Sequence, residues 1–168
     1  MILFSVDLGS VNLGYSLIET DDTSETPTLV RLIKAEYMHL TAPKIGDRLN
    51  VVLKRFEKEI EDNMVDMIIY ENSVFRGGQA PALYQVAGIF HLVSSVYGLP
   101  IFDPKPTQIK KLICGSGKAG KKEIEIASNK WLTNPQESFI NDHVSDAVSI
   151  GIYGYLRHQM NQKNWIPN

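Results

Sequence analysis

Residues 2–14, ILFSVDLGSVNLG, decide the fold because they place one carboxylate, Asp7, at the end of a short apolar run. The run is rich in β-branched and aromatic residues and is followed by the turn-formers Gly9 and Ser10, so it predicts a buried strand. A second strand is expected over residues 14–18. The charge of Asp7 would then face a cleft and position a metal ion or a phosphate, although an Asp that caps the following turn fits this stretch equally well.

Length and composition indicate the class of protein. The chain has 168 residues, 43% hydrophobic and 21% charged, which fits one globular domain over residues 1–168. No apolar run approaches the roughly 20 residues of a membrane span, and the start has neither a basic lead nor a cleavage site. We therefore expect a cytoplasmic protein without a membrane partner. The single Cys114 excludes a multi-cysteine metal site, so any metal must use oxygen and imidazole ligands.

The net charge of -2 conceals an uneven distribution of charge. Residues 104–122 contain six lysines and no acid, and the other residues carry a net charge of -8. The local field of this segment predicts a polyanionic partner more directly than the total charge does. The six are Lys105, Lys110, Lys111, Lys118, Lys121 and Lys122.

Hydrophobic periodicity indicates the remaining elements. Alternation predicts a third strand over residues 29–40, and helical spacing predicts an amphipathic helix over residues 44–63. Three strands with short connections favour an antiparallel meander, and a strand that follows a helix favours parallel pairing. Together they predict an α/β protein with a five-stranded mixed sheet flanked by helices. The other expected elements are strands over 65–72 and 99–103 and helices over 79–97, 104–114, 121–132 and 142–159.

Further acids accompany Asp7 in this arrangement. Glu71 ends the fourth strand, and parallel pairing with the first strand would bring it toward Asp7, although a lone Glu at a strand end is often only solvated. His143 and Asp146 share one face of the last helix and are suitable ligands for a hard metal ion. Asp142 could instead be the metal ligand, or it could cap the start of the helix. Taken alone, His143 would be interpreted as a surface histidine.

Several other segments indicate binding partners. The helix Gln79 to Tyr97 is apolar around most of its circumference, so it is either central or shared with a second subunit. Phe75 and Arg76 lie in a glycine-containing loop and can stack on a base and touch phosphate, or fold onto the core. The glycine-rich loop over residues 115–120 joins two helices and lacks P-loop spacing. It suits a nucleic-acid backbone or is a solvated basic loop.

This order of elements and acids resembles the ribonuclease H-like superfamily and, within it, the RuvC family of Holliday junction resolvases. The matching segments are DLGSVNLGY at 7–15, IIYE at 68–71, IKK at 109–111 with GSGKAGK at 115–121, and HVSDA at 143–147. Leu8 and Leu13 stand where the family usually has proline and threonine. The family aromatic that enters the junction centre follows the glutamate by three residues, whereas Phe75 follows Glu71 by four.

The resemblance implies a ribonuclease H-like fold and a Mg²⁺-dependent endonuclease that makes paired nicks in Holliday junctions from a homodimer. Phosphodiester hydrolysis of this kind can use two divalent ions, and Mn²⁺ can replace Mg²⁺. The expected metal ligands are Asp7 in a bridging role, with Glu71, Asp146 and His143; His143 is alternatively a proton-transfer group. Lys121 completes the catalytic set by stabilising charge on the phosphate. The expected DNA-binding residues are Phe75, Arg76, Lys105, Lys110, Lys111, Lys118, Lys121 and Lys122.

Other functions remain compatible with the sequence. Residues 7–12 also resemble the phosphate-binding turn of actin- and sugar-kinase-like ATP-binding modules, although those proteins use two such domains. A ribonuclease H acting on RNA·DNA hybrids, a broader branched-DNA debranching enzyme and a non-catalytic DNA-binding relative are further alternatives.

Overall fold

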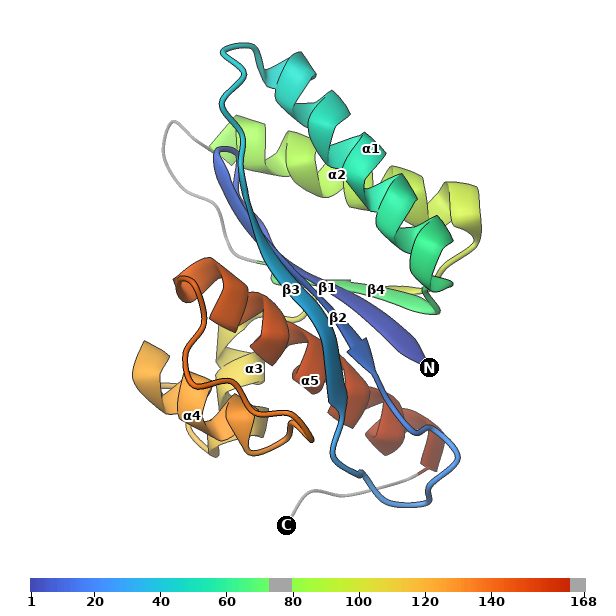
Figure 1. The fold of residues 1–168 in the computed structure, drawn as a ribbon, viewed down its shortest axis with the longest axis vertical. Coiled ribbons are helices and arrows are strands. Elements are labelled where there is room, and N and C mark those ends of the chain that lie inside the picture. Colours follow the sequence, from blue (N-terminus) through green and yellow to red (C-terminus); the bar gives the residue numbers. More distant parts are fainter. Residues whose placement is uncertain (73–79, 164–168) are drawn as a thin grey trace.

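A five-stranded mixed sheet, in the order β3-β2-β1-β4-β5, lies at the centre of the protein (Figure 1). The computed structural model describes residues 1–72 and 80–163. β1 pairs antiparallel with β2 and β2 with β3, whereas β1 with β4 and β4 with β5 are parallel pairs. This confirms the predicted α/β class and mixed sheet. The strands are β1 (Ile2–Asp7), β2 (Asn12–Glu19), β3 (Arg31–His39), β4 (Met67–Tyr70) and β5 (Ile101–Phe102).

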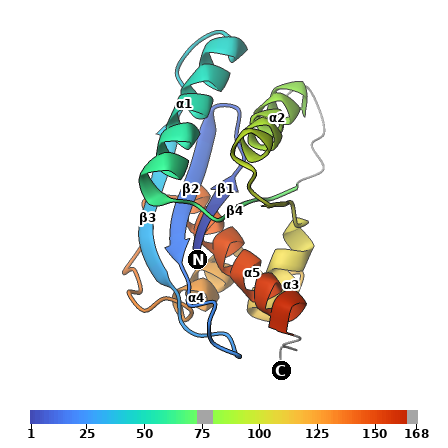
Figure 2. The ribbon, with the colours of Figure 1, turned by 90° about the vertical axis from the view of Figure 1, so that its right-hand side faces the viewer.

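Helices cover both faces of this sheet. α1 (Ile45–Asn63) and α2 (Ala80–Tyr97) pack on one face. α5 (Asp142–Lys163) crosses the other face, with α3 (Pro106–Cys114) and α4 (Lys121–Asn129) beside it (Figures 1 and 2). Within the described ranges, no helix is both long and apolar enough to cross a membrane.

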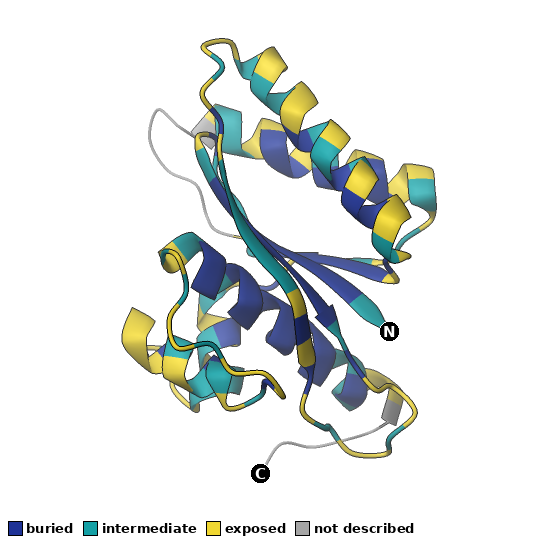
Figure 3. Cartoon of the chain, viewed as in Figure 1, coloured by how far each residue is buried: buried dark blue, intermediate teal, exposed yellow. Residues whose placement is uncertain are grey.

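The alternation of β1 side chains supplies both hydrophobic cores. Phe4 and Val6 belong to the cluster beneath α1 and α2, whereas Leu3 belongs to the cluster beneath α5. Burial on both faces explains why β1 is apolar on successive residues instead of alternating with polar ones. The buried surfaces of the helices accordingly face the sheet, and their exposed surfaces face outward (Figure 3).

Several predicted elements are shorter than expected, among them β4, which contains four of the residues predicted over 65–72. The helix predicted over residues 121–132 ends at Asn129, because Leu132 leaves it to form a parallel bridge with Val30. Val30 donates to the Trp131 carbonyl at 2.8 Å, an intersegment bond that a continuing helix could not make. β5 contains only two of the residues predicted over 99–103.

α2 is not a central helix, which was one of the two alternatives that its apolar circumference left open. Val86 and Phe90 are fully buried, whereas the side of the helix facing away from the sheet is exposed. That side still carries large apolar side chains: Tyr84 is 57% exposed, Leu92 52% and Val96 68%.

The start of α5 approaches β2 closely because position 14 has no side chain. A Cβ atom on Gly14 would lie 2.0 Å from the carbonyl oxygen of His143 and 2.9 Å from the backbone nitrogen of Val144. Backbone atoms cannot move aside as a flexible side chain would. Gly14 therefore permits the distance at which the first turn of α5 meets the sheet.

We expect Gly14→Ala to lower the free energy of unfolding by about 1–3 kcal/mol, the usual cost of overpacking. Urea denaturation followed by circular dichroism measures the change. Gly46→Ala is the matched control because a Cβ there meets nothing within 4 Å; its stability should stay the same or rise by up to about 1 kcal/mol. A Gly14→Ala variant as stable as the parent would contradict the close approach.

Candidate active site

The ends of two parallel strands place Asp7 and Glu71 at the same edge of the sheet. Val6 of β1 is in register with Tyr70 of β4, and the Glu71 N–H continues the ladder by donating to the Val6 carbonyl at 3.4 Å. The next residue on each strand is an acid. Parallel pairing thus brings Glu71 toward Asp7, as the sequence indicated, and both residues are partly buried.

The first turn of α5 adds His143 to this edge. The side-chain oxygen of Asn141 accepts the Val144 N–H at 3.1 Å and caps the helix start. His143 Nδ1 then lies 2.6 Å from Oδ2 of Asp7. This hydrogen bond is the main cause that raises the pKa of His143 above its ordinary value. The structure thus holds His143 against the carboxylate of Asp7.

Asp146, one turn further along α5, shares an electrostatic environment with both strand-end acids. The pKa of the Asp146 carboxyl is raised to about 6, chiefly by burial and further by the negative charge of Asp7 and, more weakly, that of Glu71. The positive charge of Lys121 lowers the pKa of Asp146. The carboxyl groups of three chain segments therefore influence one another across one small region.

Two lysines of the basic segment reach the same region. A hollow of about 160 Å³ is lined by Glu71 and Asp146 together with Lys110 of α3 and Lys121 of α4. The Nζ of Lys121 lies 2.6 Å from Oδ2 of Asp142. That contact is the main reason why the pKa of Lys121 is raised and that of Asp142 is lowered. Asp142 therefore pairs with a lysine at the rim of the site.

The donor set fits a hard divalent cation. Among the residues that the structure describes, no three His, Cys, Asp or Glu side chains already surround one point closely enough to hold an ion. Carboxylate oxygens are nevertheless the ligands that Mg²⁺ takes from proteins. Besides burial, the negative charges of Asp7 and Glu71 contribute to the raised pKa of Asp146, so these carboxylates repel one another here. A cation held by Asp7, Glu71 and Asp146 would offset that repulsion.

Tyr37 is a neighbour of the site that the sequence did not reveal. Its ring stacks on that of His143, with centroids 6.1 Å apart and planes inclined by 20°. The Tyr37 hydroxyl donates to Oδ1 of Asn12 at 2.5 Å, and His39 Nδ1 lies 2.9 Å from the same oxygen. Alternation along β3 indicates which face Tyr37 occupies, but the sequence contains no signal for the helix that meets it there.

The other predicted DNA-binding lysines are not among the residues that line the hollow of about 160 Å³. Lys105 directly before α3, Lys111 on α3, Lys118 on the loop after it and Lys122 at the start of α4 are all exposed. The glycine-rich loop joins two helices, as predicted. Phe75 and Arg76 fall outside the residues that the structure describes.

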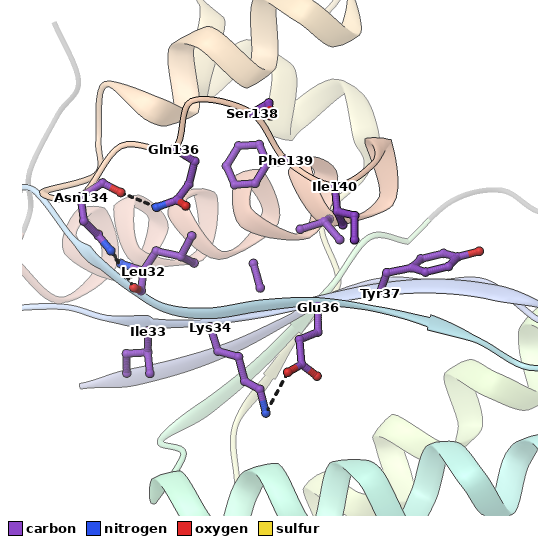
Figure 4. A pocket seen from close by; sticks show the side chains of 12 residues that line it. Leu32, Ile33, Lys34, Glu36, Tyr37, Asn134, Gln136, Ser138, Phe139 and Ile140 are labelled. Carbon is purple, nitrogen blue, oxygen red and sulfur yellow. Dashed lines mark hydrogen bonds and ion pairs between the residues drawn. The ribbon is translucent and has the colours of Figure 1, made fainter.

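A larger hollow of about 510 Å³ lies along β3 but does not have the same chemistry (Figure 4). Its one carboxylate, Glu36, is paired with Lys34 at 3.4 Å and with Arg55 at 2.9 Å. Phe139 and Ile140 form an apolar wall on the opposite side of the strand (Figure 4). The acids and lysines of the smaller hollow are therefore the stronger candidate for an active site.

Known proteins share this sequence and fold. The family model described as crossover junction endodeoxyribonuclease RuvC matches residues 3–153. A relative of that name from Carboxydothermus hydrogenoformans is 23% identical over 163 residues, which cover 94% of this chain and 97% of the relative. Another, from Pseudothermotoga lettingae, is 29% identical over 152 residues, covering 89% and 91%.

Solved structures show the same fold. The structure described as T. thermophilus RuvC in complex with Holliday junction substrate aligns with a TM-score of 0.84 at 20% identity and covers 96% of both chains. The yeast mitochondrial Holliday junction resolvase Ydc2 aligns with a TM-score of 0.68 at 12% identity, covering 96% of this chain and 81% of Ydc2. The resemblance drawn from the motifs is confirmed, and with a family match over nearly its whole length this chain belongs to the crossover junction endodeoxyribonuclease RuvC family.

Proposed function

We propose that this protein is a structure-selective endodeoxyribonuclease that resolves Holliday junctions and related branched DNA by metal-dependent phosphodiester hydrolysis. One observation supports the proposal above all: the carboxylates of Asp7, Glu71 and Asp146, from three separate segments, are close enough to influence one another electrostatically. Lys110 and Lys121 line the same hollow as Glu71 and Asp146. Carboxylates alone repel a phosphate. The adjoining lysines and a cation held by the acids make such a site suitable for a phosphodiester.

Each residue has a distinct role in the proposed reaction. Asp7, Glu71 and Asp146 would hold divalent cations, which we take to be two Mg²⁺ ions replaceable by Mn²⁺, with Asp7 as the central ligand. When bound, such ions would supply an activated water and neutralise charge on the scissile phosphate. His143, oriented by Asp7 and Tyr37, is a further ligand or moves a proton. Lys121 stabilises the charge that develops on the phosphate.

The exposed lysines of the basic segment hold the DNA backbone. Lys105, Lys111, Lys118 and Lys122 project from a surface that also includes the loop between α3 and α4. Contacts to phosphates fix the position and orientation of a duplex without reading its sequence. This suits an enzyme that selects a branched structure, and Phe75 and Arg76 stay predicted contacts near the crossover.

Two symmetric nicks in one junction need two active sites, so we propose a two-fold homodimer. The exposed face of α2 is the proposed interface, because Tyr84, Leu92 and Val96 leave a row of large apolar side chains in water. Burial of such side chains against a second copy would stabilise the dimer by the hydrophobic effect.

The family match favours a nuclease over the other candidates. The RuvC family model matches residues 3–153, so the match does not favour an ATP-binding module or a ribonuclease H that acts on RNA·DNA hybrids. A single domain over residues 1–168 and a cytoplasmic location stay predictions that accompany the proposed function.

With Mg²⁺, the purified protein should cut a four-way junction at paired positions and leave a linear duplex of the same sequence intact. Gel electrophoresis of a junction, a fork, a duplex and an RNA·DNA hybrid measures the selectivity, and EDTA should abolish cutting. Cleavage of the hybrid alone would favour the ribonuclease H alternative. Absence of metal-dependent cleavage on every substrate would rule out the nuclease proposal.

Asp7→Asn should reduce junction cleavage by at least about 100-fold, since it removes the charge of the bridging ligand. Junction binding in EDTA, measured by fluorescence anisotropy, should stay within about twofold of the parent because no lysine is changed. Asp47→Asn, an exposed acid at the start of α1, is the control and should cut normally. Normal cutting by Asp7→Asn would contradict the site assignment.

A Leu92→Asp, Val96→Asp double variant should convert the dimer to a monomer, because charges at the interface core would lose hydration on association. Light scattering coupled to size-exclusion chromatography gives the mass directly. Val51→Asp on α1, where the valine is 48% exposed, is the matched control and should stay dimeric. A monomeric parent, or a double variant that stays dimeric, would show that α2 does not form the interface.

A further inference from the structure

A third hollow, of about 460 Å³, lies between α3 and α5. Figure 2 shows α3 beside the C-terminal half of α5, on the face of the sheet that α5 covers. Both helices contribute polar and apolar side chains to this groove. The lining residues are Gln108, Lys111, Leu112, Tyr153, Arg157 and Met160.

This groove is adjacent to the candidate active site along both helices. On α3, Lys110 lines the active-site hollow and the next residue, Lys111, lines the groove. On α5, Asp146 lines the first hollow, and Tyr153 and Arg157 follow it by seven and eleven residues. These spacings keep the side chains on one side of a helix. At 1.5 Å per residue, Asp146 and Arg157 are about 16 Å apart along the axis.

The charge of the groove is entirely positive. Lys111 and Arg157 come from different helices, and no carboxylate is among the lining residues. Among the residues that the structure describes, Arg157 makes one hydrogen bond, from Nη1 to the sulfur of Met160 at 3.8 Å. In the described ranges, each of the other arginines donates a hydrogen bond to an oxygen. Arg31 bonds the Glu19 carboxylate, Arg48 the Ser10 carbonyl, and Arg55 the Glu36 carboxylate.

Two neutral donors complete the lining. The side-chain oxygen of Gln108 accepts the Lys105 N–H at 2.9 Å, which leaves its amide NH₂ as a donor. Tyr153 is only 6% exposed, and burial raises the pKa of its hydroxyl, so the hydroxyl keeps its proton at neutral pH. A guanidinium, an ammonium, an amide and a phenol therefore line one groove, and all of them donate hydrogen bonds.

We propose that this groove binds a backbone phosphate of the same DNA strand or duplex that enters the active site, with Arg157 and Lys111 as its ligands. The inference deepens the proposed function and rests on it. An arginine fork matches the oxygens of a phosphodiester, and the lysine adds a point charge. About 16 Å corresponds to roughly five steps of 3.4 Å along a duplex, so the groove would hold DNA several nucleotides from the cut.

The salt dependence of junction binding tests this inference directly. Each lost phosphate contact should reduce the slope of log K against log salt concentration by about 0.9 for duplex DNA. Anisotropy titrations in EDTA at several salt concentrations should show this loss for the Arg157→Gln, Lys111→Gln double variant, because both side chains bind the same phosphate. Each single variant should lose part of it.

Three matched variants separate this contact from a structural effect. Arg157→Lys should restore most of the slope because it keeps the charge. Lys54→Gln, an exposed lysine on α1 on the other face of the sheet, should leave the slope unchanged. Met160→Leu, which keeps the apolar volume of the groove, should also leave it unchanged. Circular dichroism melting should show the same midpoint for every variant.

Two results would overturn the inference. If the double Arg157→Gln, Lys111→Gln variant is folded and keeps the parent's slope, the groove does not contact DNA, while the proposed function stands if the parent binds and cuts the junction. If that variant keeps the slope and calorimetry finds that inorganic phosphate binds the parent with an affinity that depends on Arg157, the groove is a site for a free anion instead of DNA. A parent that binds no junction at all would overturn both the inference and the proposed function.

Discussion

The close contact between the first turn of α5 and β2 determines the candidate site. Gly14 allows the backbone of His143 to lie where any Cβ would collide with it. Parallel pairing of β1 and β4 places Asp7 and Glu71 at neighbouring strand ends, and α5 then brings His143 and Asp146 over the same edge. Each of the three segments contributes one or two side chains, so displacement of any one would disperse the acids.

This contact also concentrates like charges, which is unfavourable without a counter-charge. Burial is the main cause that raises the pKa of Asp146, and the negative charges of Asp7 and Glu71 add to it, while Asp7 is hydrogen-bonded to His143. The structure compensates partly at the rim, where Lys121 pairs with Asp142 and lowers the pKa of Asp146. A divalent cation would compensate more fully, since it can contact several carboxylates at once.

Much of this arrangement could be predicted from the sequence, for physical reasons that particular elements illustrate. The apolar run before Asp7 and the helical spacing of residues 45–63 are local signals, and the structure contains both elements. The end of α4 at Asn129 could not be predicted locally, because it depends on the pairing of Leu132 with Val30 about one hundred residues away in the chain. The stacking of Tyr37 on His143 depends likewise on how α5 crosses β3, which periodicity does not specify.

Anomalous diffraction from crystals grown with Mn²⁺ locates the ion independently of activity. We expect anomalous density bounded by the carboxylates of Asp7, Glu71 and Asp146, and loss of that density in an Asp146→Asn crystal. Mn²⁺ bound only elsewhere on the protein, with these three carboxylates free of metal, would contradict this expectation.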